Sequence, residues 1–477
     1  MWNRPFLLLI AVAFLHTLPL SSGAQEQAVG PAERTLPGST QELLIYQAGE
    51  TALKKKDYKT AAEKLSTIVN KYPFSEFYEE SIYGLGNALF SSGAREEGIT
   101  LLEKALVIYP SNWFARQAHI LAGDYYYRTR QKEDALRHYT VLLEQFEGPS
   151  LRDLVYLRIG ILKMEMGDLE GATKDLEHLI NEYPQSPHYK EGLVSLVWAS
   201  NQVGRAYRGA ELYDSHQQDF ASMADDGKGL LFAMDSYLAL KLYDRAIDVL
   251  AEFDRVYPNS RYKINALARR GQALMGRNDL DGAEKALRQA LSISRKSAEV
   301  VLVLATLYSE KGKIAEALAT LGAFPATEKN REGVLMSLLQ GKLYFKTNKQ
   351  GEAIKAYSNA LAVGESLAAT DAMVKEALPR IHVGMADTLY AQGKYPEAAQ
   401  AYRKAKDSGA TPEDLPWILY RTGECLEKVG DSAKAAESYQ ELLSATTDPL
   451  WTGRANNRLE GIEWAARIKE KKEKSAQ

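Results

Sequence analysis

The sequence of 477 residues contains a single cysteine, Cys425. A chain with one thiol can form no internal disulfide, so its folded state must be stabilised by packing alone. Cys425 lies in an apolar helical pattern, which predicts a buried and unreactive thiol, with pairing to another chain's thiol as the alternative.

Sequence signals of catalysis and metal binding are also lacking. No two of the seven histidines have metal-ligand spacing, and there is no second cysteine to help them. Neither a Gly-x4-Gly-Lys-Ser/Thr phosphate loop nor a Gly-x-Ser-x-Gly nucleophile motif occurs. Acidic pairs such as Glu79-Glu80, Glu96-Glu97 and Asp225-Asp226 fall on polar helix faces or in turns. We therefore expect no enzyme, no catalytic residues, no cofactor and no metal.

Neither sign of charge is in large excess, because the chain has 59 basic and 62 acidic residues. With no basic stripe along the chain, nucleic acid is not an expected partner. The C-terminal lysines, from Lys469 to Lys474, alternate with Glu470 and Glu473, which is typical of a solvated helical tail. A hydrophobic content of 45% predicts a folded chain.

One apolar run stands out, at the N-terminus. Arg4 precedes residues 5–15, which are mostly apolar, and the small residues 21–24 follow. This order predicts a secretory signal peptide over residues 1–24, cleaved after Ala24, with an uncleaved anchor as the alternative. The run is shorter than a membrane span of about 20 residues, and no cysteine near the cleavage site could carry a lipid. Residues 25–40, with two glycines and two prolines, predict a flexible linker.

The rest of the chain is built from a repeat. The first three steps between its marker residues are 37 residues each, and one later step, from Ala353 to Ala398, is longer. A period of this size predicts a solenoid of short helical units, each of which contacts only its neighbours. The markers are Ala61, Gly98, Ala135, Ala172, Ala210, Ala246, Ala283, Ala317, Ala353, Ala398 and Ala435.

Each unit has two helices separated by a turn and ended by proline or another break. In the fourth unit, Ile159-Gly160 belongs to the first helix, Gly167-Asp168 forms the turn, and Ala172 and Leu176 begin the second helix, which ends before Pro184. Glycine and alanine stand where the two helices approach closely, and leucine or tyrosine fills the remaining space.

These residues resemble the tetratricopeptide repeat, whose pattern is aromatic-x2-Leu-Gly-x2-Tyr, then Ala-x3-Phe, then Pro. The resemblance covers residues 41–445 and implies an all-α fold, a right-handed α-solenoid of about eleven helix pairs. We divide it into an N-terminal array (41–220) and a C-terminal array (221–445) that continues the first. Residues 446–477 are expected to form a capping helix and a charged tail. Two places depart from the pattern: Asp214 replaces a large apolar residue, and residues 365–375 form an insertion or an extended helix.

A narrower likeness concerns unit endings of the type Tyr-Pro-x-Ser, at residues 72–75, 183–186 and 257–260. They are similar to those of bacterial envelope tetratricopeptide proteins, namely the outer-membrane β-barrel assembly lipoprotein and the Tol–Pal-associated coordinator of cell-wall synthesis. The likeness implies a periplasmic location, with or without association with the outer membrane, and no integral span after signal cleavage.

In the family, the first helix of each unit lines the concave surface, and its contact positions carry over to this chain residue by residue. An aromatic ring beside an amide or a charge suits peptide recognition. The contact residues predicted in this way are Glu80, Tyr83, Asn87, Phe90, Asp124, Tyr127, Arg128, Asp235, Gln272, Asp387, Tyr390, Trp417 and Tyr420. The same positions in the third and fourth units are Gln117, Ile120, Leu157, Ile161 and Met164.

Our leading hypothesis is therefore an exported scaffold that binds envelope proteins or an extended peptide through its concave surface. A second hypothesis is a structural spacer in a secretion or exopolysaccharide-export complex. A third is an enzyme that acts on glycan or cell-wall material, for which the sequence offers no recognisable acid/base pair.

Overall fold

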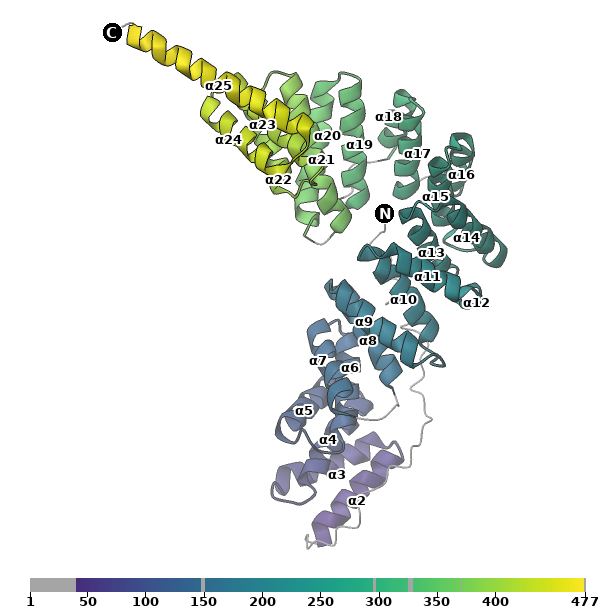
Figure 1. Cartoon of the computed structure of the whole chain (residues 1–477). Coiled ribbons are helices and arrows are strands. Elements are labelled where there is room, and N and C mark those ends of the chain that lie inside the picture. Colours follow the sequence, from purple (N-terminus) through teal and green to yellow (C-terminus); the bar gives the residue numbers. More distant parts are fainter. Residues whose placement is uncertain (1–39, 147–150, 295–296, 325–328, 370, 476–477) are drawn as a thin grey trace. The chain divides into compact units, whose positions relative to one another are not determined.

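The computed structural model describes residues 40–146, 151–294, 297–324, 329–369 and 371–475 (Figure 1). All regular structure in these ranges is helical. The expected signal peptide and linker lie outside them, except for Thr40, which begins the first described helix. The chain divides into two compact units, one containing residues 40–223 and the other residues 224–475.

The first unit consists of five helix pairs and one short additional helix. The helices are α2 (Thr40–Lys54), α3 (Tyr58–Lys71), α4 (Tyr78–Ser92), α5 (Arg95–Ile108), α6 (Ala115–Arg128), α7 (Lys132–Gln145), α8 (Arg152–Met166), α9 (Leu169–Glu182), α10 (Tyr189–Gln202), α11 (Ala206–Ser215) and α12 (Gln217–Ala221).

The second unit consists of six helix pairs and a long terminal helix. The helices are α13 (Lys228–Ala239), α14 (Tyr243–Val256), α15 (Lys263–Gly276), α16 (Leu280–Ile293), α17 (Ala298–Glu310), α18 (Ile314–Gly322), α19 (Arg331–Lys346), α20 (Gln350–Leu367), α21 (Ala372–Ala391), α22 (Tyr395–Asp407), α23 (Leu415–Val429), α24 (Ser432–Ala445) and α25 (Pro449–Ser475). The eleven pairs confirm the expected number of repeats.

Local sequence sets the boundaries of each pair, as α8 and α9 show. Gly167 ends α8 with a φ of 89°, a left-handed conformation that glycine adopts without steric cost. Asp168 then caps α9, because its carboxylate accepts a 2.9 Å hydrogen bond from the amide of Gly171. The second helix ends at Glu182, just before Tyr183 and Pro184.

The core of each pair depends on a small residue opposite a large one. A methyl group on Gly160 would lie 2.7 Å from the Leu176 side chain, which is closer than atoms can approach. Leu176 and Ala172 are fully buried. Burial of a leucine side chain contributes about 1.5–3 kcal/mol, so repetition of this contact accounts for a large part of the stability of the stack.

The two departures from the repeat pattern have structural counterparts. Exposed Asp214 lies near the end of α11, which has only 10 residues and is followed by α12 with its buried Phe220. The insertion lengthens two helices, since α20 has 18 residues and α21 has 20. Asp371 caps α21 and forms a buried 2.7 Å ion pair with Arg331.

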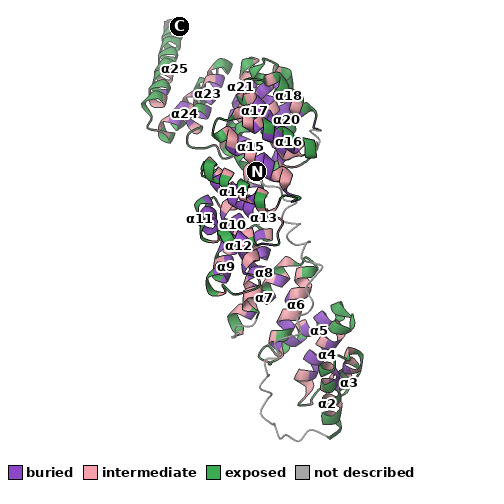
Figure 2. Ribbon diagram, turned by 90° about the vertical axis from the view of Figure 1, so that its right-hand side faces the viewer, coloured by how far each residue is buried: buried purple, intermediate pink, exposed green. Residues whose placement is uncertain are grey.

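Helix α25 closes the second unit. Its first half packs against α24 and α23 through Trp451, Ala455, Leu459 and Ile462, as expected for a cap. Its second half extends beyond these helices (Figure 1) and is exposed from Glu463 to Lys474 (Figure 2). Across the described ranges, none of the helices combines the length and apolar character that a bilayer span requires.

Candidate functional site

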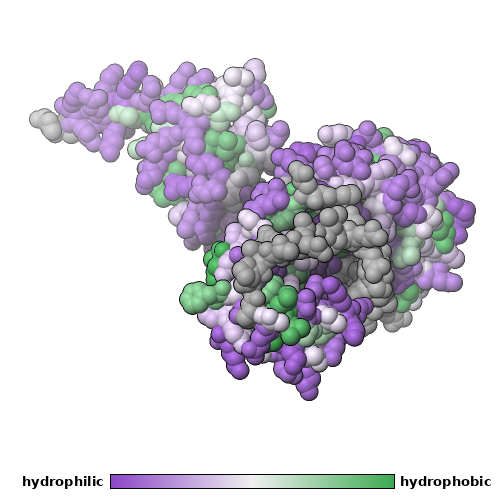
Figure 3. Space-filling model, turned by 90° about the horizontal axis from the view of Figure 1, so that it is seen from below, coloured by the Kyte–Doolittle hydropathy of each residue, from purple (hydrophilic) through white to green (hydrophobic). Residues whose placement is uncertain are grey.

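The first helix of each pair carries the predicted contact residues, and we call their combined surface the first-helix face. It is described separately for each unit. Surface side chains in Figure 3 are mostly hydrophilic, with apolar ones in small groups. The described residues contain no cluster of three or more histidine, cysteine or acidic side chains suited to a metal ion.

Tyr83 requires a correction. The sequence predicts it as an open contact residue, but its side chain is 2% exposed. Its hydroxyl donates a 2.9 Å hydrogen bond to the carbonyl of Tyr109, and its ring stacks on Phe114 with centroids 6.4 Å apart. Tyr83 therefore joins successive pairs within the unit and is not available to a partner in this structure. Burial raises the pKa of its hydroxyl to about 12.

Several neighbouring predicted residues keep accessible surface. Arg128 is exposed, while Glu80, Asn87 and Phe90 are half-buried. Asn87 accepts a 3.1 Å hydrogen bond from Ser91, one turn away on the same helix. At the corresponding positions of the third unit, Gln117 is exposed and Ile120 is half-buried. Those of the fourth unit are buried and require the same correction as Tyr83: Leu157, Ile161 and Met164.

Asp124 does not project freely from the first-helix face. The hydroxyl of Tyr139 donates a 2.7 Å hydrogen bond to its carboxylate, and Arg158 of the next pair donates to both groups. The guanidinium of Arg158 also lies 5.3 Å from the ring centre of Tyr127. The structure thus brings together Asp124 and Tyr127, two predicted residues, around an arginine that the prediction missed.

The second unit contains a related arrangement. Asp235 forms a bidentate ion pair with Arg269, at 2.8 and 3.2 Å, and Glu299 contacts the same guanidinium at 3.1 Å. Arg269 is 3% exposed, so this group of three charges is removed from water. Gln272 lies near by in sequence on α15 and is half-buried.

A second complete acid–tyrosine–arginine group occurs at Asp387. The hydroxyl of Tyr402 donates to Asp387 and accepts a 3.3 Å hydrogen bond from Arg421. The guanidinium of Arg421 lies 3.6 Å from the ring centre of Tyr390 and 5.1 Å from that of Trp417. Burial raises the pKa of the Asp387 carboxyl, although its hydrogen bond with Tyr402 opposes the shift.

Trp417 and Tyr420 belong to an aromatic cluster to which the terminal helix contributes. The ring of Trp451 lies 6.2 Å from Trp417 and 5.9 Å from Tyr420. Arg454, which is exposed, places its guanidinium 5.0 Å from the ring centre of Trp451 and 5.8 Å from that of Tyr420. We call Trp417, Tyr420, Trp451 and Arg454 the aromatic–arginine cluster.

A third group repeats the spacing with glutamate as the acid. Arg458 lies 2.8 Å from Glu424 and 3.4 Å from Glu427, and the hydroxyl of Tyr439 donates a 2.7 Å hydrogen bond to Glu427. In all three groups the tyrosine follows the first acid by 15 positions and the arginine follows it by 34. This fixed spacing was a signal in the sequence that could have revealed the intramolecular pairing.

The single cysteine directly follows Glu424 of the third group, and the charges of Arg421 and Asp387 of the second group also act on its thiol. Cys425 is buried, as predicted, and burial raises the pKa of its thiol to about 12.

With this geometry established, sequence comparisons define the class of the protein. Residues 39–190 match a family model described as an outer membrane lipoprotein. Residues 274–340 match one tetratricopeptide-repeat model, and residues 338–414 and 383–449 match another. The chain is therefore a tetratricopeptide-repeat protein with an all-α solenoid fold. It resembles members of the class from the bacterial cell envelope.

One relative gives this likeness a more specific form. The outer membrane protein assembly factor BamD of Rickettsia prowazekii is 23% identical over 221 residues, which span 46% of this chain and 81% of that protein. Among solved structures, yeast Tom70 aligns with a TM-score of 0.40 and 12% identity over 90% of this chain and 96% of its own. MamA aligns with a TM-score of 0.31 and 19% identity over 37% of this chain and 94% of its own.

Proposed function

We propose that this chain is an exported, periplasmic scaffold that binds an envelope protein, or an extended peptide segment of one, on the concave first-helix face. It acts by binding and not by catalysis. The family matches and the BamD likeness support an envelope scaffold, and the export signal expected in residues 1–24 supports the location.

The observation that carries this proposal is the aromatic–arginine cluster. Large rings supply much buried area at small entropic cost, and a guanidinium stacked on them is already oriented for a carboxylate or a backbone carbonyl. Trp417 is 36% exposed, and Arg454 makes no ion pair with any described residue. The cluster therefore offers both anchoring area and an unused set of donors.

Site-specific photo-crosslinking in intact producing cells tests the proposal. The photoreactive amino acid is placed at Trp417 in one full-length chain and at Tyr207 in another. Tyr207 is a suitable control because it is 63% exposed but lies on α11, the second helix of its pair. We expect a discrete protein adduct at position 417 and none at position 207.

Substitutions then connect the adduct to the cluster. The crosslinker is moved to Arg454, and Trp417→Ala/Tyr420→Ala should remove the adduct while Tyr207→Ala leaves it intact. Adducts that form only at second-helix positions would contradict the proposal and favour the structural spacer. Retention of the adduct in the double variant would exclude these two rings as anchors.

A further inference from the structure

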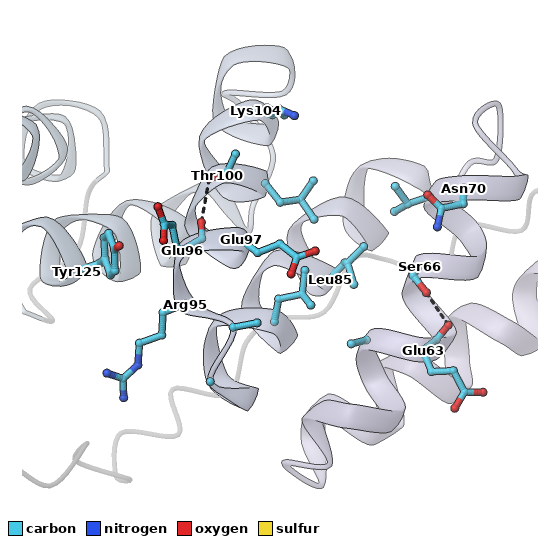
Figure 4. A pocket seen from close by; sticks show the side chains of 16 residues that line it. Glu63, Ser66, Asn70, Leu85, Arg95, Glu96, Glu97, Thr100, Lys104 and Tyr125 are labelled. Carbon is cyan, nitrogen blue, oxygen red and sulfur yellow. Dashed lines mark hydrogen bonds between the residues drawn. The ribbon is translucent and has the colours of Figure 1, made fainter.

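A groove separate from the first-helix face lies between the second helices of the first two pairs. It has a volume of about 1190 Å³ and is lined by α3, α4 and α5, with Tyr125 of α6 at one end (Figure 4). Its apolar lining comes from Val69, Leu85, Leu89 and Leu101. A groove of this construction suits the apolar side of a helix.

The groove is bordered by acidic side chains. Glu63 stands on the α3 side, and Glu96 and Glu97 on the α5 side. Glu97 points into the groove toward Leu85, whereas Arg95 points away from it (Figure 4). The carboxylates of Glu96 and Glu97 have no hydrogen bond or ion pair with any described residue. Lys104 also lines the groove, so three carboxylates stand against one lysine and the outward-pointing Arg95. This balance favours an occupant with basic side chains beside an apolar stripe.

The exposed half of α25 has this composition. Gly461, Trp464, Ala465 and Ile468 lie at helical spacing on one side, and Trp464 is 68% exposed. Lys471 and Lys472, three and four positions after Ile468, continue the stripe at its C-terminal end. Glu463 and Glu470 lie on the opposite side of the helix, whereas Lys469 and Glu473 line the same hollow as Ala465 and Ile468. A solvated tail does not need an exposed tryptophan and isoleucine in register.

The dimensions of the two surfaces also agree. At 1.5 Å per residue, the stripe from Gly461 to Lys472 is about 16 Å long. The wall that α3 contributes to the groove, from Ala62 to Asn70, is about 12 Å long by the same measure. An amphipathic helix of this length fits the groove along most of its apolar stripe.

We propose that the exposed half of α25 in one copy of this chain docks in the α3–α5 groove of a second copy. Trp464 and Ile468 cover the leucines and valine of the groove, and Lys471 and Lys472 pair with Glu96 and Glu97. Because the two surfaces differ, the contact is head-to-tail, and each added copy leaves one groove and one helix available. The mass of the assembly therefore grows with concentration until a ring closes.

Sedimentation velocity of the full-length chain between about 1 and 200 μM tests this contact. We expect a weight-average mass that increases with concentration beyond that of a dimer. Glu96→Lys/Glu97→Lys and Lys471→Glu/Lys472→Glu should each weaken association at least tenfold, because each places like charges together. Combining all four substitutions in one chain, or mixing the two double variants, should restore association.

Matched controls separate this contact from general effects of charge. Arg467→Glu/Lys474→Glu changes the net charge of the same helix by the same amount but lies farther from the stripe, so it should leave association unchanged. Trp464→Ala/Ile468→Ala should abolish association without changing the circular dichroism of the chain, because neither side chain belongs to the cluster of described residues through which α25 packs on α23 and α24.

Three outcomes would overturn the proposal. The first is a monomer at every concentration. The second is association that none of the charge reversals affects. The third is a chain that does not self-associate but sediments with vesicles of anionic lipid, when Trp464→Ala/Ile468→Ala removes this binding. That result would assign the apolar stripe of α25 to a membrane surface.

Discussion

Asp124 and Arg158 stand 34 positions apart in the sequence, and their side chains pair across two successive helix pairs with the hydroxyl of Tyr139 between them. Asp387 and Arg421 are joined in the same way through Tyr402. The tyrosine occupies the position where other pairs have leucine, as at Leu176. It thus fills the core with its ring and reaches the first-helix face with its hydroxyl.

The first prediction concerns the hydroxyl of Tyr402. Tyr402→Phe keeps the ring but removes the group that joins Asp387 to Arg421, and it leaves a half-buried carboxylate with one fewer donor. We expect the free energy of local opening to fall by about 1–2 kcal/mol. Hydrogen exchange of peptides from α21 to α23 measures it, because exchange reports the free energy of local opening in a repeat array.

Tyr357→Phe is the matched control for this substitution. Tyr357 is fully buried at the corresponding position of its pair, but its hydroxyl makes no hydrogen bond to any described residue. Its removal should therefore cost less than the removal of the Tyr402 hydroxyl. Equal losses in the two variants would show that the hydroxyl bridge contributes nothing beyond packing.

A second prediction concerns the buried charges around Arg269. Arg269→Met leaves Asp235 and Glu299 without the cation that both contact, and loss of one partner of a buried ion pair costs about 3–5 kcal/mol. We expect lower protection from hydrogen exchange in α13, α15 and α17. The triple variant Arg269→Met/Asp235→Asn/Glu299→Gln should recover most of the loss, since no uncompensated charge remains. Failure to recover would mean that packing of the arginine stem dominates.

The sequence predicted the repeat accurately because steric and helical rules act locally. The spacing of small residues, the turn at Gly167-Asp168 and the stop at Pro184 all report on contacts within one pair. The contact positions came instead from the family resemblance, which assigned Asp124, Tyr390 and Trp417 to the first helices of their pairs.

The sequence did not reveal which of these side chains are already engaged, because that depends on the next pair. Tyr83 is buried by its neighbours around Tyr109 and Phe114, which follow it by about 30 residues. Arg158 and Arg421 were missed because each repeat was interpreted alone. Comparison of positions one repeat apart identifies both arginines. Trp451 was expected in the capping helix, but its contacts with Trp417 and Tyr420 were not, because it lies outside the repeat pattern.

A third prediction tests the close approach of α8 and α9. Gly160→Ala places a methyl group 2.7 Å from Leu176, so one of the helices must move, and overpacking of this kind costs about 1–3 kcal/mol. Thermal unfolding should begin at a lower temperature in this variant. Gly351→Ala is the control, because a methyl group there meets nothing within 4 Å and alanine is the better helix former. A loss at Gly351 as large as that at Gly160 would contradict the steric argument.

The fourth prediction concerns pH and the buried imidazole of His119. Its Nδ1 lies 2.8 Å from Nδ1 of His138, whose Nε2 lies 2.8 Å from the Glu103 carboxylate. Burial, together with the charge on His138, lowers the pKa of His119 from 6.5 to about 4. The folded chain therefore takes up this proton less readily than the unfolded chain, and the free energy of unfolding must fall as the pH drops from about 6.5 toward 4.

His119→Gln isolates this contribution because it keeps a polar side chain but removes the titrating group. Between pH 7 and pH 5 the original chain should lose about 1–2 kcal/mol more than the variant, measured by urea unfolding of the first unit's helices. Glu103 titrates in a different range, since its hydrogen bond with His138 and its pairing with Arg137 lower its pKa to about 2. Its contribution is lost only as the pH falls below about 4.5, so parallel pH profiles for the two proteins above pH 5 would show that His119 is not held neutral by the fold.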